Sequence, residues 1–210
     1  MNRPDFSNYL AHFTKDGVFC SETQDESLKD IEQMSALDRL ISILRSQVIK
    51  ASTMPWTGAH AVCLTECPWS SLINHTQQYS CYGLGFNKHS VYAKHGGPAY
   101  YLRPDHLKKQ MNNLKFDKHL WPFVTPFSPI YRPKHMKGQY FPTVDFSHER
   151  EWRVPHDYPF TLDDVKFVVI KRTQDLAMFP QDLVNAIGIE KFIIMENYKF
   201  IETLWPVHIM

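Results

Sequence analysis

Helical and extended patterns follow one another along this chain in short, unequal pieces. The longest helical pattern covers residues 27–47, where apolar side chains recur at spacings of three and four. The main strand-like runs are Tyr9–Thr14, Ala61–Thr65, Cys81–Phe86 and Lys191–Met195. Because no regular strand–helix–strand rhythm joins these pieces, the sequence predicts an α+β fold. We expect compact mixed or antiparallel sheets with flanking short helices, not a doubly wound parallel sheet.

Length and charge limit the class of protein further. The chain has 210 residues, and we interpret residues 1–210 as a single α+β domain. Its formal net charge of +1 produces no overall field that would draw it onto nucleic acid or a membrane. The sequence lacks the run of about 18 apolar residues that a membrane-spanning helix needs. The N-terminal residues carry no apolar signal-peptide core, so we expect a cytoplasmic protein.

The four cysteines raise the question of a metal site. Cys63, Cys67, His75 and Cys81 could be read as a zinc set, but their spacing matches none of the usual paired patterns. Cys63 and Cys81 lie in apolar runs, where cysteine packs as a small hydrophobic residue. We therefore expect reduced cysteines in the core and no metal, with a metal ligand or a nucleophile as the alternatives.

Charge is segregated along the chain although its sum is small. Residues 16–38 hold seven acidic side chains, and residues 103–138 hold eight basic ones against two acidic ones. The basic region includes a loop rich in proline and aromatic residues at about 119–142, which is too long for a passive connector. Cations interleaved with rings are typical of single-stranded nucleic-acid sites, and a solvated helix face beside an aromatic mini-core is the alternative. The candidate nucleic-acid contacts are Lys108, Lys109, Arg132 and Lys134.

The sequence predicts strand structure with a break over Val144–Val154, and its segment FSHEREWRV is interpreted as extended. Alternate residues of a strand share a face, so Glu149, Glu151 and Arg153 are expected on one face. The two carboxylates would then lie about 7 Å apart along the strand. An edge strand with a charged outer face and local ion pairs is the structural alternative to a functional site.

His12 and Thr14 flank Phe13 in the first strand-like run and are expected to share a face. Together with Glu151 they could form a site for attack on a glycosidic carbon. A carboxylate there accepts a hydrogen bond from a ribose hydroxyl and stabilises the developing oxocarbenium ion. A histidine or threonine could hold the other sugar or a carboxamide. A core or surface histidine without a chemical role is the alternative.

Several segments in a fixed order resemble the AbiGi-type abortive phage-resistance family. They are HFT, LISILRSQVIKAS, AVCLTECPWSSLINH, YSCYGLGFNKHSVYAKHGGPAYYL and HEREWRVP, and they extend over roughly residues 9–170. The matching residues are Cys63, Glu66, Pro68, Tyr82, Gly83, Gly85, Phe86, Lys88, Glu149, Arg150, Glu151, Trp152 and Arg153. The resemblance implies a bacterial phage-defence protein of an abortive-infection or toxin–antitoxin system, including the role of antitoxin.

A more distant resemblance is to the ADP-ribosyltransferases, including the DNA-modifying toxins. Those proteins begin with a strand carrying His or Arg, continue with a helix and a short strand with Ser, and end with a catalytic Glu on a late strand. Here AHFT, the helical pattern, IKAS and Glu151 occupy those places, although the family's Ser-Thr-Ser motif is missing. The resemblance implies an ADP-ribosyltransferase-like fold with NAD as cofactor.

This second resemblance also assigns roles to individual residues. Glu151 would bind the ribose 2′-hydroxyl and stabilise the oxocarbenium ion, and Glu149 would orient the acceptor. The residues that would contact NAD are His12, Phe13, Thr14, Ser52 and Tyr82, with Tyr101 as an alternative stacking ring. The basic, aromatic loop precedes the catalytic Glu, where such enzymes read their acceptor, and this favours nucleic acid as the acceptor.

Two functions from different classes remain. The first is an NAD-dependent, ADP-ribosyltransferase-like defence enzyme, which predicts that His12 and Glu151 share a cleft lined by aromatic side chains. The second is a non-catalytic antitoxin, or a nucleic-acid- or protein-binding module of the same fold, which predicts a closed cleft or a Glu151 held by Arg153. A nuclease would need carboxylates clustered around magnesium, and Glu149 and Glu151 are the nearest pair.

Overall fold

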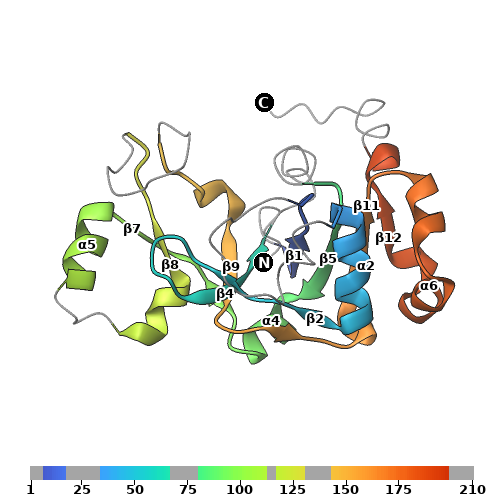
Figure 1. The fold of residues 1–210 in the computed structure, drawn as a ribbon, viewed down its shortest axis with the longest axis horizontal. Helices are drawn as coiled ribbons and strands as arrows, with labels where there is room; N and C mark the ends of the chain where they lie inside the picture. Colours follow the sequence, from blue (N-terminus) through green and yellow to red (C-terminus); the bar gives the residue numbers. More distant parts are fainter. Residues whose placement is uncertain (1–6, 18–33, 67–79, 113–116, 131–142, 199–210) are drawn as a thin grey trace, which may run out of the picture. The chain divides into compact units, whose positions relative to one another are not determined.

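The computed structural model describes residues 7–17, 34–66, 80–112, 117–130 and 143–198 (Figure 1). The chain divides into two compact units that interleave along the sequence. The first unit contains residues 1–48, 67–87 and 159–210, and the second contains residues 49–66 and 88–158. Since each unit combines separate stretches, no single cut in the sequence separates them. The interpretation of the chain as one domain stays a prediction.

The first unit is built on a sheet with strand order β12-β11-β5-β1. Its strands are β1 (Tyr9–Phe13), β5 (Gly83–Asn87), β11 (Val165–Ile170) and β12 (Phe192–Ile194). β5 is antiparallel to both β1 and β11, whereas β11 and β12 are parallel. Buried side chains such as Leu10, Leu84, Phe86 and Val168 form the core of this unit. The strands expected from the apolar runs near residues 9–14, 81–86 and 191–195 are therefore confirmed.

The helix α2 (Ala36–Ser46) in the first unit begins at a side-chain cap. Ser35 Oγ accepts a hydrogen bond from the backbone N–H of Asp38 at 3.1 Å, as is usual for an N-cap serine. Leu37, Leu40 and Leu44 supply the buried stripe. The sequence predicts a helix from residue 27, but Met34 and Ser35 are not helical, and residues 27–33 lie outside the described part of the chain.

Shorter helices complete the first unit. They are η3 (Leu162–Asp164), η4 (Thr173–Met178), α6 (Gln181–Ile187) and η5 (Ile189–Lys191). η5 leads directly into β12, and Phe179 packs edge-on against Phe192 with ring centroids 5.3 Å apart. The red end of the ribbon in Figure 1 shows α6 and β12 together.

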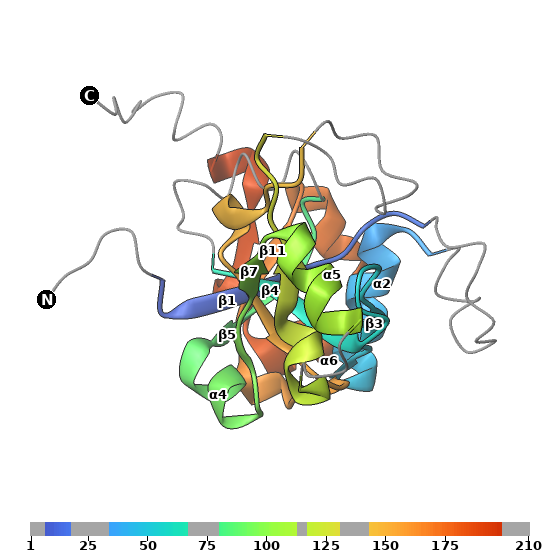
Figure 2. The same cartoon turned by 90° about the vertical axis from the view of Figure 1, so that its left-hand side faces the viewer.

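The second unit has an antiparallel sheet with strand order β3-β4-β9-β6. Its strands are β3 (Ser52–Thr53), β4 (His60–Thr65), β9 (Glu151–Val154) and β6 (Gly97–Pro98). A separate parallel pair joins β7 (Tyr100–Leu102) to β8 (Val124–Pro126). The helices of this unit are α4 (Lys88–Ala93), α5 (Pro104–Asn112), η1 (Lys118–Phe123) and η2 (Ser147–Glu149). Figure 2, the ribbon turned by 90°, labels α4, α5, β4 and β7 of this unit.

Two short strands, β2 (Val48–Ile49) and β10 (Tyr158–Pro159), lie where the chain passes from one unit to the other. The α+β class, with mostly antiparallel strands and short helices, is confirmed. Across the residues that the structure describes, no helix is both long and apolar enough to cross a membrane.

Two expectations need correction. Within the region Val144–Val154, where strands with a break are expected, the extended interpretation of residues 147–150 is wrong, because residues 147–149 form η2 and Arg150 turns with a φ of 44° before β9 begins. The segment 119–142 is not wholly a loop, because its described part contains η1 and β8. The remaining residues, 131–142, lie outside the described part of the chain.

Candidate functional site

The pairing of β4 with β9 brings together the polar residues at the centre of the second unit. Its register places Cys63 opposite Arg153 and Thr65 opposite Glu151. Directly opposed residues of an antiparallel pair share a face, and alternate residues of each strand do the same. All four side chains therefore belong to one face, so the prediction that Glu151 and Arg153 share a face is confirmed.

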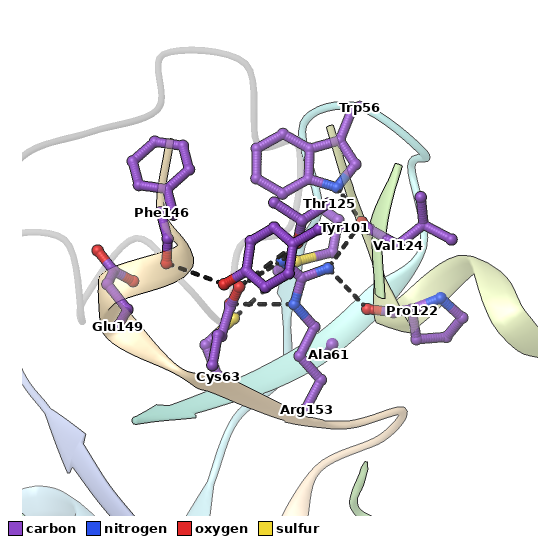
Figure 3. Close-up of polar contacts among 12 residues, drawn as sticks. Trp56, Ala61, Cys63, Tyr101, Pro122, Val124, Thr125, Phe146, Glu149 and Arg153 are labelled. Carbon is purple, nitrogen blue, oxygen red and sulfur yellow. Dashed lines mark hydrogen bonds and ion pairs between the residues drawn. The ribbon is translucent and has the colours of Figure 1, made fainter. Parts of the chain in front are cut away.

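Arg153 is fully buried, and all of its N–H groups are used (Figure 3). Nε donates to Glu151 Oε1 at 3.0 Å, and Nη2 donates to Glu151 Oε2 at 2.7 Å and to Thr125 Oγ1 at 2.5 Å. Nη1 donates to the backbone carbonyls of Pro122 at 3.0 Å and Val124 at 2.8 Å. These five bonds exhaust the donors of a guanidinium, so the buried charge is both paired and fully hydrogen-bonded.

Side chains of the loop between β3 and β4 make further hydrogen bonds to η1 and β8. Trp56 Nε1 donates to the carbonyl of Val124 at 2.5 Å, and the Trp56 ring centroid lies 5.4 Å from Arg153 Cζ. That distance is suitable for a cation–π contact. Thr57 Oγ1 donates to the carbonyl of Trp121 at 3.2 Å. Three side chains, Trp56 and Thr57 of the loop and Arg153 of β9, thus fix the backbone of η1 and β8.

Glu151 is held in place by this arrangement. Its side chain is 11% exposed, and both of its carboxylate oxygens accept hydrogen bonds from Arg153. Thr125 Oγ1 adds a weak contact to Oε2 at 3.5 Å. A forked arginine–carboxylate pair fixes the orientation of both groups. A Glu151 held by Arg153 is what the non-catalytic hypothesis predicts.

Glu149 occupies a different position from the one expected. It ends η2, only 9% of the residue is exposed, and its backbone carbonyl accepts a hydrogen bond from Thr65 Oγ1. The left-handed turn at Arg150 separates it from β9, so the prediction that Glu149 shares a strand face with Glu151 is wrong. Figure 3 shows the Glu149 side chain directed away from the Arg153 guanidinium.

Two neighbouring groups are kept neutral by their surroundings. Burial, followed by the negative charges of Glu151 and Glu149, raises the pKa of Tyr101 to about 12. The Tyr101 hydroxyl therefore acts as a donor, and it donates to the carbonyl of Phe146 at 2.8 Å. Burial, followed by the charge of Glu151, also raises the pKa of the Cys63 thiol. Cys63 is consequently a packed thiol and not an activated nucleophile.

The expected NAD contacts at the start of the chain belong to the first unit. His12 and Phe13 are partly buried residues of β1, opposite Leu84 and Gly83. Thr14 follows the strand and is only 4% exposed. Its Oγ1 donates to the carbonyl of Ala36 at 2.6 Å, which ties β1 to the start of α2.

Tyr82 and Ser52 complete the set of expected NAD contacts. The Tyr82 hydroxyl donates to Asp175 Oδ2 at 2.9 Å, and burial together with that hydrogen bond raises the pKa of Tyr82 to about 12. Ser52 is an exposed residue of β3 in the second unit. The expected NAD residues are thus divided, because Ser52, Glu149 and Glu151 belong to the second unit and the others to the first.

The expected nucleic-acid contacts are described only in part. Lys108 and Lys109 are exposed residues of α5, whereas Arg132 and Lys134 lie outside the described residues. The exposed residues Lys118, His119 and Leu120 begin η1. Tyr100, which is 55% exposed, pairs with Val124 directly after η1. Cations and exposed apolar groups therefore occur together around η1 and β7.

Sequence reasoning missed the partners of Arg153 outside its own strand, namely the carbonyls of Pro122 and Val124, the Thr125 hydroxyl and the ring of Trp56. The sequence signal that could have indicated such partners is an arginine beside apolar residues of a strand, because a buried guanidinium requires several hydrogen-bond acceptors. For metals, the described residues contain no group of three or more His, Cys, Asp or Glu side chains that could hold an ion. Cys67 and His75 of the zinc alternative lie outside that part of the chain.

Comparisons with protein-family models, with curated proteins and with solved structures find no match for this chain. The resemblances to the AbiGi-type family and to the ADP-ribosyltransferases therefore stay predictions.

Proposed function

We propose that this protein is a non-catalytic, nucleic-acid-binding module of an abortive-infection or toxin–antitoxin system, built on an ADP-ribosyltransferase-like fold. The observation that carries the proposal is the pairing of Glu151 with Arg153. An ADP-ribosyltransferase needs this carboxylate for the ribose of NAD, and here both of its oxygens already accept from a buried guanidinium.

The energetics of the pair support a structural role for Glu151. Removing one partner of a buried ion pair leaves an uncompensated charge and costs about 3–5 kcal/mol. Arg153 is fully buried, and only 11% of the Glu151 side chain is exposed. Moving the carboxylate toward a substrate would therefore carry a large part of that cost. Glu151 thus serves as the counter-ion of Arg153.

The binding function is supported by the surface around α5 and η1. Lys108 and Lys109 are exposed on α5, and Lys118 is exposed at the start of η1. The net charge of the whole chain is only +1, so any attraction of nucleic acid must come from such a local cluster. The exposed ring of Tyr100 adds a surface on which a base can stack.

A second candidate function, NAD-dependent ADP-ribosyl transfer, is favoured by one observation. Glu151 is not completely enclosed, and each carboxylate oxygen has a further lone pair beyond its bond to Arg153. A carboxylate oriented in advance is useful for stabilising an oxocarbenium ion. Under this candidate Glu151 would be catalytic, His12 and Thr14 would contact NAD, and nucleic acid would be the acceptor.

One pair of titrations tests the proposal against this candidate. The purified protein is titrated with NAD by calorimetry and with a fluorescent single-stranded oligonucleotide by anisotropy. We expect oligonucleotide binding that weakens steeply with salt, and no heat with NAD. NAD binding that weakens in both Glu151→Gln and His12→Ala would favour the enzyme and overturn the proposal.

The basic surface is tested by charge reversal with a matched control. We expect the variant Lys108→Glu/Lys109→Glu to weaken oligonucleotide binding and to reduce its salt slope. The variant Lys166→Glu/Lys171→Glu reverses two exposed lysines of the first unit, and we expect it to bind like the wild type. Equal losses in both variants would indicate attraction by net charge alone and would contradict the assigned surface.

A further inference from the structure

We propose that Arg153 and Glu151 are positioning residues, which brace the segment of η1 and β8 so that it presents a preformed stacking and charge surface to single-stranded nucleic acid. This segment, residues 118–126, is called the braced segment below. This inference rests on the proposed function, and it adds that the ion pair of Arg153 with Glu151 contributes to nucleic-acid binding.

The first support is the direction of the bonds that leave Arg153. Three of them reach the braced segment, at the carbonyls of Pro122 and Val124 and at Thr125 Oγ1. The other two reach Glu151, which holds the guanidinium plane in a fixed orientation. One buried side chain of β9 therefore fixes three sites on the braced segment.

The second support comes from independent side chains that bind the same backbone. Trp56 Nε1 donates to the carbonyl of Val124, and Thr57 Oγ1 donates to the carbonyl of Trp121. The braced segment includes Pro122 and Pro126, which have no N–H to contribute to a backbone ladder. Side-chain donors from outside the segment thus compensate for the regular hydrogen bonds that prolines cannot make.

The third support is what the braced segment carries on its outer side. Lys118, His119 and Leu120 are exposed, and Leu120 is 50% exposed. Tyr100 is held beside the segment by the pairing of β7 with β8, which places it opposite Val124. A cation and a ring at fixed positions suit a phosphate and a stacked base.

Rigidity is the physical link between the brace and binding. Ordering a flexible segment on association costs free energy that is subtracted from the affinity, whereas a segment fixed beforehand avoids that cost. Arg153 and Glu151 would therefore raise affinity without touching the ligand. Loss of the brace should lower affinity but leave the number of phosphate contacts unchanged.

The test uses the affinity for a single-stranded oligothymidylate and the dependence of that affinity on salt. Arg153→Lys keeps the charge but loses the planar fork. Trp56→Phe keeps an aromatic ring but loses the N–H that binds Val124 and the larger indole face beside Arg153. We expect both variants to bind about fivefold or more weakly, with the salt slope of the wild type. Lys118→Glu should instead reduce the salt slope. Hydrogen exchange of residues 118–126 should become faster in the two brace variants.

A matched control separates the brace from a general loss of stability. Lys50→Gln breaks the exposed ion pair of Lys50 with Asp157, 2.8 Å long, in the same unit. We expect it to bind the oligonucleotide like the wild type. Affinities of Trp56→Phe and Arg153→Lys equal to the wild-type affinity would overturn the inference while leaving the proposed function intact. A wild-type protein that binds no oligonucleotide would overturn the proposed function itself.

Discussion

Lys88 and Glu66 form an ion pair in which Lys88 Nζ lies 2.8 Å from Glu66 Oε1, and both side chains are largely buried. Glu66 follows β4, and Lys88 begins α4. The ammonium group also lies 5.6 Å from the centroid of the Trp152 ring on β9. The pair therefore connects the start of α4 to the β4–β9 pair within the second unit.

Breaking this pair should destabilise the protein. Lys88→Met leaves the Glu66 carboxylate buried without its cation, and we expect a loss of about 1–3 kcal/mol in the free energy of unfolding. Removing both charges in Glu66→Gln/Lys88→Met should recover part of that loss, because the uncompensated charge is gone. Urea denaturation of the wild type, of the single variants Glu66→Gln and Lys88→Met and of the double variant gives the coupling energy between the two side chains. Additive effects of the two single substitutions would contradict a direct interaction.

Gly85 should be intolerant of any side chain. A Cβ atom at this position would lie 2.1 Å from Cζ of Phe167, the residue opposite it on β11. We expect Gly85→Ala to lower the free energy of unfolding by about 1–3 kcal/mol through overpacking. Gly97→Ala is the control, since its Cβ would meet Phe123 only at 3.4 Å. Thermal melting of both variants measures the difference, and a Gly85→Ala variant as stable as Gly97→Ala would contradict the crowding.

Asp175 should make stability depend on pH. Burial acts to raise its pKa, but the hydrogen bonds from Tyr82 and Arg172 outweigh it and lower the pKa below the usual value. A lowered pKa in the folded state gives stability that is complete above the unfolded-state pKa, about 3.9, and is lost as the pH falls through the folded-state pKa. The gap in melting temperature between wild type and Asp175→Asn should therefore be large at neutral pH and shrink in acid.

The control for this measurement is Asp163→Asn, which changes an exposed aspartate of the same unit. We expect its melting temperature to follow that of the wild type across the pH range. A gap for Asp175→Asn that stays constant as the pH falls from neutral through the lowered folded-state pKa of Asp175 would show that the carboxylate charge does not contribute.

Cys63 should react slowly in the native protein. Its raised pKa suppresses the thiolate, which is the form that attacks alkylating reagents. We expect iodoacetamide at mildly alkaline pH to label the Cys63 peptide much more slowly in buffer than in denaturant. Peptide mapping by mass spectrometry follows the labelling of this residue over time. Equal labelling rates in the two conditions would rule out the protected thiol.

Local patterns predicted several elements correctly because the signal for each lies within a few residues. Period-two and continuous apolar runs gave β1, β4, β5 and β12, and spacings of three and four gave the buried stripe of α2. The extended conformation expected for residues 147–150 is wrong for a local reason as well. Ser147 and Asp145 form a hydrogen-bonded turn, and Arg150 adopts a left-handed conformation, which extended-strand reasoning does not anticipate.

The sequence by itself determined the α+β class, the short elements and the shared face of Glu151 and Arg153, because hydrophobic periodicity and strand alternation act over neighbouring residues. Only the tertiary structure decided what that face does. The acceptors of Arg153 belong to residues 122–125 and to Glu151. Lys88 pairs with Glu66, which is distant from it in the sequence. A buried charge loses its hydration, and only polar groups that folding brings near it can compensate for that loss. Which groups these are depends on the tertiary structure.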